Sequence, residues 1–465
     1  MIDVAVIGGG ISGLATADIL KRNGYGVIVL ERQNRAGGNA LSECIGGFLM
    51  EHGPSTVNAM SDVANTVSSE LGLDGKRCVL GSNVKTRYLV DDGALSGIAA
   101  HPLGFLTSNY LSLGAKIRLL GEFAVPRRTE SGEETVHDFF ARRFGTEFAE
   151  RVVDPMVGGI FSGLAREVSM AVFSRLLGFE REHGSITRAL LGRYRQGGTM
   201  PANRLFSWRD GVGALPDALS RRMGSCLLTG TGVRAISRGA RSFRIRTDKS
   251  GTLEARAVVI ATQPHVAALL LRDVDSDTAE AVGEIDAPPL AVVYFGFRRQ
   301  DVEHPLDGLG FLTSQDQRCH LIGAQFCSTM FPGRAPDGHV SIVGYVGGAR
   351  DRELARLPTR DLLHLVRDEF SRLLGIHGSP VVHQVRHWPR GLPQYAMGHV
   401  DRIARIEAAR QRVPGLYLTG NYINGVSVAD CLTRARATAT DVSAFLQSHG
   451  KDACAVLVPD GALSF

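Results

Sequence analysis

The first thirty residues place a glycine-rich turn between an apolar strand and a helix. The run Ile2–Ile7 reads IDVAVI and leads directly into the glycine-rich segment GGGISG, residues 8–13. Apolar residues then recur at helical spacing, and Val27–Leu30 reads as a second buried strand. Glycines at positions 8, 10 and 13 allow a tight turn, close approach of a pyrophosphate and close packing of helix on strand. The sequence therefore predicts a strand–turn–helix–strand unit that binds a dinucleotide.

An acidic residue at the end of the second strand supports this prediction. Glu31 lies 18 residues after Gly13, where a carboxylate accepts hydrogen bonds from a ribose. A merely structural glycine turn is the alternative, but it does not account for the acid. NAD and FAD both remain open at this point.

Charge and composition exclude several other classes of protein. The 465 residues carry 52 Lys and Arg against 47 Asp and Glu, and a net charge of +5 gives no basis for nucleic-acid binding. Seven cysteines are scattered without a C-x-x-C pair, which favours thiols in a reducing compartment. No apolar run reaches the roughly 18 residues of a spanning helix, and the first residues read as a strand, not a signal peptide. We expect a cytoplasmic protein, with peripheral attachment to the inner face of the cell membrane left open.

Two short segments follow the predicted ribose-binding acid. Arg35-Ala36-Gly37-Gly38 comes directly after it, and the sequence EHGPS at residues 51–55 follows a short strand-like run. This pattern resembles the flavin-containing amine oxidase superfamily. In that superfamily an R-x-G-G segment packs near the diphosphate, so the resemblance favours non-covalently bound FAD. Near the other end, a strand closing in Gly420 is followed by the sequence GVSV (residues 425–428) and a helix. A helix N-terminus is a ready anion site and faces the flavin in this superfamily; an ordinary βα unit is the alternative.

Because the cofactor segments lie at both ends, the predicted cofactor domain is discontinuous and carries two inserts. The fold class is α/β, and α+β overall. We predict a Rossmann-like FAD domain (residues 1–82, 211–275 and 396–465), a β-sheet substrate domain (83–92, 200–210 and 276–395) and a helical, membrane-binding-type domain (93–199).

The two inserts differ in their periodicity. The second contains strand-like runs at Leu290–Phe297 and Val340–Val346 and an amphipathic helix near Arg360–Leu374. The first repeats apolar residues at helical spacing near basic side chains such as Lys116 and Arg127. That pattern fits a segment lying on a membrane surface, and it fits equally a helical subdomain with a core of its own.

The inserts and the segment that follows the second insert contain several short motifs. They are residues 134–140 (ETVHDFF), 154–163 (DPMVGGIFSG), 168–170 (VSM), 330–336 (MFPGRAP), 345–348 (YVGG) and 392–399 (LPQYAMGH). These motifs are similar to those of the oxygen-dependent protoporphyrinogen oxidases. The likeness runs nearly end to end and is more specific than the FAD motif. It implies that a tetrapyrrole is held between the three domains.

The resemblance also implies residue roles. Arg87 matches an arginine that pairs with a substrate propionate, a role that suits a guanidinium fork. Gly159 matches a glycine whose backbone faces the pyrrole nitrogens, with a plain turn glycine as the alternative. Leu312 and Tyr345 match positions that sandwich the macrocycle, and Gln325 stands where plant mitochondrial-type enzymes carry leucine.

The cofactor residues follow in the same way. We expect FAD to contact Gly8, Gly9, Gly10, Ile11, Ser12, Gly13, Glu31, Arg32, Gly37, Gly38, Asn39, Gly53, Pro54, Ser55, Thr56, Val233, Trp388, Gly420, Gly425, Val426, Ser427 and Val428. Ser55 departs from the family pattern, which has asparagine near the flavin.

The implied reaction removes six electrons and six protons from protoporphyrinogen IX to give protoporphyrin IX. Hydride passes from a bridge carbon to flavin N5 in each of three cycles, and molecular oxygen reoxidises the flavin with release of hydrogen peroxide. Since the cofactor carries the chemistry, we expect no catalytic acid or base in the protein. No metal site is expected either, because His383 and His387 read as strand residues about 13 Å apart.

Several alternatives stay open at this stage. Coproporphyrinogen III, with four propionates in place of two, is the nearest rival substrate, and the polar Gln325 is compatible with it. An amine oxidase or carotenoid desaturase would share the FAD motifs but not the internal ones, and a non-catalytic flavin-binding scaffold is the non-enzymatic alternative. The partners implied are the tetrapyrrole, oxygen and a downstream chelatase, with a monomer or a homodimer both compatible.

Overall fold

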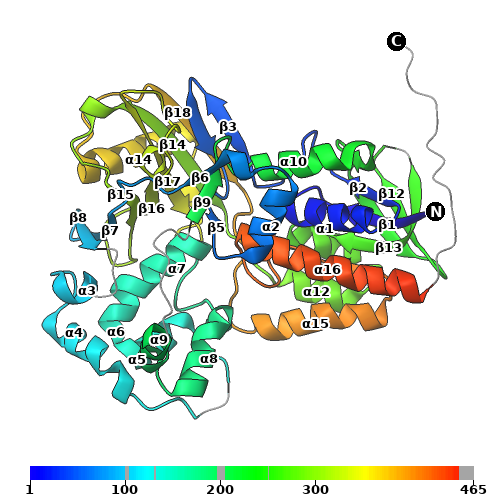
Figure 1. Ribbon diagram of the computed structural model, residues 1–465, viewed down its shortest axis with the longest axis horizontal. Helices are drawn as coiled ribbons and strands as arrows, with labels where there is room; N and C mark the ends of the chain where they lie inside the picture. Colours follow the sequence, from blue (N-terminus) through cyan, green and yellow to red (C-terminus); the bar gives the residue numbers. More distant parts are fainter. Residues whose placement is uncertain (100–103, 130–131, 196–204, 250, 450–465) are drawn as a thin grey trace.

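The glycine-rich turn joins the first strand of a largely parallel sheet to a helix buried against it (Figure 1). The computed structural model describes residues 1–99, 104–129, 132–195, 205–249 and 251–449. In the first sheet the strand order is β10-β2-β1-β13-β12-β11, and β19 pairs with β13. Its strands are β1 (Ile2–Ile7), β2 (Val27–Leu30), β10 (Leu227–Leu228), β11 (Val233–Arg238), β12 (Phe243–Thr247), β13 (Thr252–Ile260) and β19 (Leu416–Leu418).

Strand β13 holds this sheet together. It runs parallel to β1 along most of its length, pairs antiparallel with β12 through its first residues, and pairs parallel with β19 through Val258, Val259 and Ile260. Residues Ala255 and Ala257–Ile260 of β13 are fully buried, as a strand covered on both faces requires.

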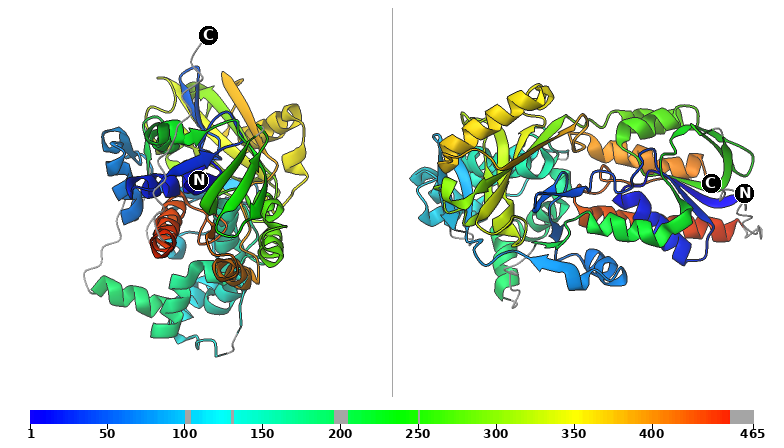
Figure 2. Two further views of the ribbon diagram at one scale, coloured as in Figure 1. Left: turned by 90° about the vertical axis from the view of Figure 1, so that its right-hand side faces the viewer. Right: turned by 90° about the horizontal axis from the view of Figure 1, so that it is seen from above.

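Helices cover both faces of the first sheet, as the left view of Figure 2 shows. One apolar core includes residues of α1 (Ile11–Arg22), α2 (Asp62–Glu70), α10 (Ala214–Met223) and α16 (Val428–Ser448). The opposite core includes residues of α11 (Pro264–Leu271), α12 (Ser276–Gly283) and α15 (His399–Arg412). Helices from the two ends of the chain, α1 and α16, thus share one core.

A second, mostly antiparallel sheet lies beside the first along the long axis of the molecule (Figure 2, right). Its order is β18-β14-β17-β16-β15-β7-β8. The strands are β7 (Thr86–Asp91), β8 (Ala94–Ala99), β14 (Leu290–Arg298), β15 (Gly308–Leu312), β16 (Leu321–Phe326), β17 (His339–Gly347) and β18 (Val382–Trp388). Helix α14 (Thr359–Leu374) covers one face through Leu362, Val366 and Phe370; α13 (Cys327–Met330) follows β16.

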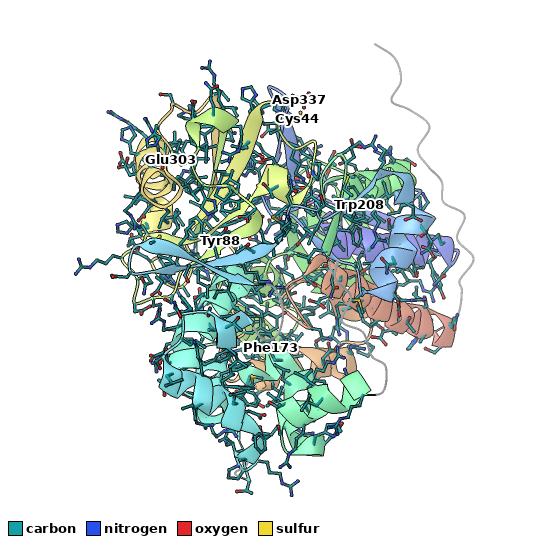
Figure 3. The ribbon with its side chains drawn as sticks, turned by 60° about the vertical axis from the view of Figure 1, so that its left-hand side comes forward. Cys44, Tyr88, Phe173, Trp208, Glu303 and Asp337 are labelled. Atoms are coloured by element: carbon teal, nitrogen blue, oxygen red, sulfur yellow. The ribbon has the colours of Figure 1, made fainter. Side chains whose placement is uncertain are left out.

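Helices between β8 and β9 form a third unit, which Figure 1 places beside the second sheet. They are α3 (Gly104–Thr107), α4 (Leu113–Leu120), α5 (Val136–Phe144), α6 (Thr146–Phe148), α7 (Asp154–Phe161), α8 (Ser174–His183) and α9 (Ile186–Arg195), with 3-10 turns at Gly121–Ala124 and Met170–Phe173 and a π-helical turn at Ala149–Val153. Figure 3 shows Tyr88 on the β7–β8 hairpin above this helical unit, in which Phe173 lies.

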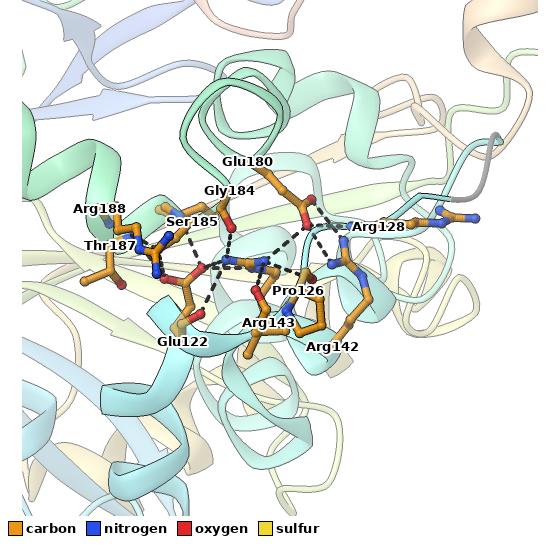
Figure 4. A network of polar contacts seen from close by, with 12 residues as sticks. Glu122, Pro126, Arg128, Arg142, Arg143, Glu180, Gly184, Ser185, Thr187 and Arg188 are labelled. Atoms are coloured by element: carbon orange, nitrogen blue, oxygen red, sulfur yellow. Dashed lines mark hydrogen bonds and ion pairs between the residues drawn. The ribbon is translucent and has the colours of Figure 1, made fainter.

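A buried ion-pair network ties the helical unit together (Figure 4). Arg143 of α5 and Glu122 are both fully buried and form an ion pair. Glu122 also accepts a 2.6 Å hydrogen bond from the Ser185 hydroxyl, while Glu180 accepts hydrogen bonds from Arg142 at 2.7 Å and Arg143 at 3.3 Å. The network therefore joins α5, α8, the turn after α4 and the start of α9.

Two small sheets and a few short turns complete the described structure. Strands β3 (Ser42–Ile45) and β4 (Phe48–Glu51) form a hairpin, and β9 (Leu205–Trp208) pairs with β5 (Val57–Asn58) and β6 (Arg77–Val79). Further 3-10 turns lie at Asp74–Lys76, Gly224–Cys226, Arg299–Asp301 and Leu354–Arg356.

The predicted elements of the first forty residues and of the second insert are present. The predicted β strands Ile2–Ile7 and Val27–Leu30 are β1 and β2, and the predicted amphipathic helix is α14. Two strands pair outside the domain to which the predicted boundaries assign them. Strand β8 falls within the predicted helical domain but pairs with β7 in the second sheet. Strand β9 falls within the predicted substrate domain but pairs with β5 and β6, which belong to the predicted FAD-domain segment 1–82. The division into three domains stays a prediction; its parts at 100–103, 130–131, 196–204, 250 and 450–465 lie outside the described residues.

Among the described residues, the structure contains no helix that is both long enough and apolar enough to span a membrane.

Candidate active site

Three positions around the start of α1 are glycine for different structural reasons. Gly8 has φ +108°, and a Cβ there would lie 2.6 Å from the carbonyl oxygen of Ala261. A Cβ at Gly13 would overlap the Gly8 carbonyl oxygen. At Gly10, by contrast, the nearest heavy atom to an added Cβ is the Gly38 Cα at 4.0 Å. Gly8 and Gly13 are thus required by the protein itself, whereas Gly10 leaves open space at the helix N-terminus, which fits a bound diphosphate.

The acid that follows β2 is already oriented toward this turn. Glu31 accepts hydrogen bonds from the backbone N–H of Gly9 and of Gln33, both at 2.7 Å, one on each carboxylate oxygen. Each oxygen keeps a further lone pair for a ribose hydroxyl. Arg32 lies next to it and is exposed. At the start of α1, Ile11 and Ser12 are buried beneath the turn.

The R-x-G-G segment closes over the same turn. Gly37 donates a 2.7 Å backbone hydrogen bond to Gly9, and Gly38 adopts φ +57° with its Cα facing Gly10. Arg35 donates to the Gly38 carbonyl at 2.7 Å, which fixes the loop. Burial, together with the charge of Arg386, lowers the pKa of Arg35, so this cation is held in a site where a nearby anion is favourable.

The segment after β4 lies against Asn39 and leads to the second sheet. A Cβ at Gly53 would overlap the Asn39 carbonyl oxygen, so the two predicted cofactor loops are in contact. Pro54, Ser55 and Thr56 follow, each partly buried. The Ser55 hydroxyl donates a 2.9 Å hydrogen bond to Oε1 of Gln325 on β16.

The predicted C-terminal cofactor loop leads into α16. Gly420 and Gly425 adopt φ +157° and +132°, and a Cβ at Gly425 would overlap the Asp430 carboxylate. Ser427 caps the helix in a reciprocal capping box with Asp430, so its own N–H is already taken. Val426 packs against the core of the helical unit, and Val428 is buried in the first core.

Two further predicted cofactor residues lie in different sheets. Trp388, at the end of β18, donates a 2.6 Å hydrogen bond from Nε1 to the carbonyl of His52, which places the indole beside the 51–56 segment. Val233 begins β11 in the first sheet and packs against the apolar core that includes residues of α11, α12 and α15.

The four predicted substrate residues of the second sheet share one face. Paired residues of neighbouring strands point to the same side: Gln325 pairs with Gly310, and Gly323 pairs with both Leu312 and Tyr345. On β7, Arg87 pairs with Ile98, which clusters with Leu89 and Leu312. This is the face opposite α14, and helix α7 lies over it, where a Cβ at Gly159 would sit 2.6 Å from Cδ2 of Leu312.

Arg87 and Tyr345 differ in how they are held. Arg87 is exposed, and its side chain makes no hydrogen bond or ion pair with any described residue, so its guanidinium is available to a carboxylate. Tyr345 donates a 3.2 Å hydrogen bond to Gln325 Oε1, and burial raises the pKa of Tyr345 well above its ordinary value. Its hydroxyl therefore stays a donor at any physiological pH.

One residue that sequence reasoning left without a role joins the cofactor loop to the helical unit. The Tyr395 hydroxyl donates to the Asn421 carbonyl at 2.8 Å and accepts from the Gly425 N–H at 2.7 Å. Its ring packs on Phe161 of α7, with centroids 5.9 Å apart. Tyr395 belongs to the motif at residues 392–399. The sequence gives no reason to single it out, because its two hydrogen-bond partners are backbone groups, which no residue type identifies.

His383 and His387 lie on β18, as expected of strand residues. Within the described ranges, no group of three or more His, Cys, Asp or Glu side chains is arranged to hold a metal ion.

Comparison with known families decides the class of the protein. Residues 11–443 match the family described as flavin containing amine oxidoreductase. The chain belongs to this family. The flavoprotein is therefore an FAD-dependent oxidase whose FAD is bound non-covalently, and the predicted fold class is confirmed.

Similar proteins include two named porphyrinogen oxidases. The flavoprotein is 30% identical to the mitochondrial protoporphyrinogen oxidase of Nicotiana tabacum, over 97% of this chain and 96% of the relative. It is 26% identical to coproporphyrinogen III oxidase of Bacillus subtilis (strain 168), over 96% of this chain and 98% of the relative. These relatives confirm the resemblance found in the sequence motifs.

A solved structure shows the same fold. A protein from Exiguobacterium sp. 255-15, provisionally named a protoporphyrinogen oxidase, superposes with a TM-score of 0.83 at 23% identity, over 96% of this chain and 99% of that one.

Proposed function

We propose that this flavoprotein oxidises protoporphyrinogen IX to protoporphyrin IX in tetrapyrrole synthesis, with oxygen as the electron acceptor and hydrogen peroxide as the reduced product. The observation that carries the proposal is the hydrogen bond between Ser55 and Gln325. It joins a loop predicted to contact FAD to the sheet face that carries Arg87, Leu312 and Tyr345. The names of the relatives support the substrate class.

The overall change removes six electrons and six protons, which requires three two-electron steps. When bound, FAD supplies the acceptor for a hydride from a bridge carbon. The protein's part is to bind, orient and enclose the macrocycle. In this proposal Arg87 pairs with a propionate, Leu312 and Tyr345 contact the two faces of the macrocycle, and the backbone of Gly159 faces the pyrrole nitrogens. No protein acid or base is assigned.

Coproporphyrinogen III is the second candidate substrate. It is supported by the polar Gln325 at a position that is leucine in the plant mitochondrial-type pattern, and by the named relatives from Bacillus subtilis and Staphylococcus aureus.

The location and the partners belong to the same proposal. We place the protein in the cytoplasm, with the helical unit resting on the inner face of the membrane and the porphyrin passed to a downstream chelatase. Exposed apolar residues on α4 support this orientation.

A side-by-side assay of the two porphyrinogens, with Arg87→Ala as the variant, tests the function. We expect oxygen-dependent porphyrin fluorescence with the wild type, and at least a tenfold higher KM in Arg87→Ala because a charge-assisted hydrogen bond is lost. The flavin absorbance of the variant should be unchanged, and Arg87→Lys should recover part of the affinity. An unchanged KM would remove Arg87 from the site. A wild type that binds FAD yet oxidises neither porphyrinogen would favour the scaffold.

A further inference from the structure

The side chain of Arg386 on β18 has no polar partner among the described residues. Its guanidinium stacks on Trp388, with Cζ 4.8 Å from the ring centroid. It makes no hydrogen bond or ion pair with any described residue, and its Nε is buried without a partner. Burying part of a cation without an anion beside it is unfavourable. The donors of this guanidinium are therefore available to a bound group.

The charge of Arg386 acts on two segments of the candidate cofactor site. Burial, and after it the charge of Arg386, lowers the pKa of Arg35 in spite of the opposite effects of Glu31 and Asp217. Burial also lowers the pKa of His52, and Arg386 acts in the same direction. Positive charge thus gathers beside the R-x-G-G loop, where a bound anion would be favourable.

Arg386 lies between a predicted cofactor contact and a predicted substrate contact. Side chains two residues apart on a strand share a face, so Arg386 and Trp388 point to the same side of β18. Across the sheet, Val292 of β14 pairs both with Arg386 and with Tyr345 of β17. Two strand spacings, roughly 10 Å, therefore separate the backbones of Arg386 and Tyr345. Val292, Tyr345 and Trp388 belong to one apolar cluster, which confirms that they share this face.

This position corresponds to the flavin end of the cofactor. The diphosphate is expected at the turn that contains Gly10, whereas the flavin ring of an oxidase has to meet its substrate. Hydride transfer adds two electrons and one proton to the neutral oxidised ring, so the reduced ring carries one negative charge unless it takes up a second proton. A partly buried cation nearby favours that charged state, because solvent and salt screen it less than they screen a surface charge.

We propose that the guanidinium of Arg386 faces the flavin ring of bound FAD and stabilises the negative charge of its reduced state. Removing this charge would make the cofactor a weaker electron acceptor. Trp388 is the positioning residue, because its ring holds the plane of the guanidinium. The role depends on FAD and not on which porphyrinogen is the substrate.

The midpoint potential of bound FAD, measured against a reference dye with no porphyrinogen present, tests this role. In Arg386→Met, which keeps an unbranched side chain without the charge, we expect reduced FAD to bind about tenfold more weakly relative to oxidised FAD, a two-electron potential about 30 mV lower. Arg386→Lys keeps the charge and should stay closer to the wild type. Arg298→Met is the matched control: Arg298 is exposed at the end of β14 remote from the Leu290–Trp388 pair, and its loss should leave the potential unchanged.

Other readouts separate this role from its alternatives. An unchanged potential in Arg386→Met overturns it. Equal weakening of oxidised and reduced FAD would indicate a diphosphate contact, and a raised KM with an unchanged potential would indicate a substrate contact; each overturns it as well. A lowered potential in a protein that oxidises neither porphyrinogen would support the role and overturn the proposed function. If Arg386→Met does not retain FAD, the uncharged Arg386→Gln is measured in its place.

Discussion

At the scale of single residues, the glycine turn separates positions that the fold needs from positions that the cofactor needs. An added Cβ at Gly13 overlaps a backbone oxygen, whereas at Gly10 it meets only ordinary van der Waals distance. We expect Gly10→Ala to keep the unfolding temperature of the FAD-free protein within a few degrees but to weaken FAD binding at least tenfold, because its methyl group would occupy the predicted diphosphate space. Gly13→Ala should lower the unfolding temperature itself. Thermal melts and flavin titrations check both, and full FAD affinity in Gly10→Ala would contradict the prediction.

A buried histidine makes stability depend on pH. His399 is 5% exposed, both ring nitrogens lack a hydrogen-bond partner, and its ring lies 4.2 Å from that of Tyr395. Burial and the charge of Arg402 lower the pKa of His399 from 6.5 to about 4, against smaller opposite effects of the Ile423 backbone, of Glu133 and of the Tyr422 backbone. Between pH 6.5 and pH 4 the unfolded chain therefore binds a proton at His399 that the folded protein does not bind. The free energy of unfolding falls as the pH drops through this range.

The expected size of this loss is about 3 kcal/mol, from a shift of roughly two and a half pKa units. His399→Leu removes the titrating ring. Urea unfolding at pH 7.5 and pH 4.5 should therefore show a smaller loss of unfolding free energy in the variant than in the wild type. Equal losses in the two proteins would mean that His399 is not the group responsible.

At the scale of elements, the helical unit depends on one buried charge pair. Burial acts to raise the pKa of Glu122, but hydrogen bonds from Ser185, Thr187 and Arg143 outweigh it and hold the pKa at about 2. Arg143→Met leaves that carboxylate charged and buried, so we expect a loss of about 3–5 kcal/mol in unfolding free energy. The double variant Arg143→Met/Glu122→Gln should recover part of it in denaturant titrations. Additive losses in the double variant would argue against the pairing.

Sequence patterns predicted elements well where periodicity alone determines them. The strands β1 and β2 and the helix α14 could be predicted from their apolar residues. A buried strand is a short apolar run and an amphipathic helix repeats apolar residues at helical spacing, so both patterns are visible within the element itself. The placement of β8 and β9 could not be read in the same way, since a short strand joins whichever edge the tertiary fold presents. The same limit applies to the contact between Ser55 and Gln325. Both are predicted site residues, but a hydrogen bond between residues 270 positions apart leaves no local pattern in the sequence.

At the scale of the whole molecule, exposed apolar side chains gather on one helix of the third unit. Leu113, Ile117 and Leu120 follow one another at helical spacing on α4 and are 75%, 63% and 58% exposed, with Phe123 just beyond at 51%. Lys116 belongs to the same helix. A helix with an outward apolar face and a cation beside it fits a membrane surface.

Vesicle binding tests this orientation. Replacing Leu113, Ile117 and Leu120 together by serine should reduce co-sedimentation with vesicles of phosphatidylglycerol and phosphatidylcholine at least tenfold, because most of the apolar contact area is lost. Leu269→Ser, at a residue 55% exposed on α11, serves as the control and should bind like the wild type. Equal binding by the triple variant would show that α4 does not face the lipid.

The shared core of α1 and α16 has a consequence for how the protein is made. A ribosome releases β1 and α1 first. Their neighbour β13 emerges only after the first insert, and β19 and α16 emerge only after both inserts have been synthesised. Until then β1 and α1 keep part of their apolar surface uncovered, and the cofactor-binding unit is the last of the three to be completed. Translation that stops before residue 428 would therefore yield two inserted units without the site they serve, and the protein acquires its flavin chemistry only after α16 has been synthesised.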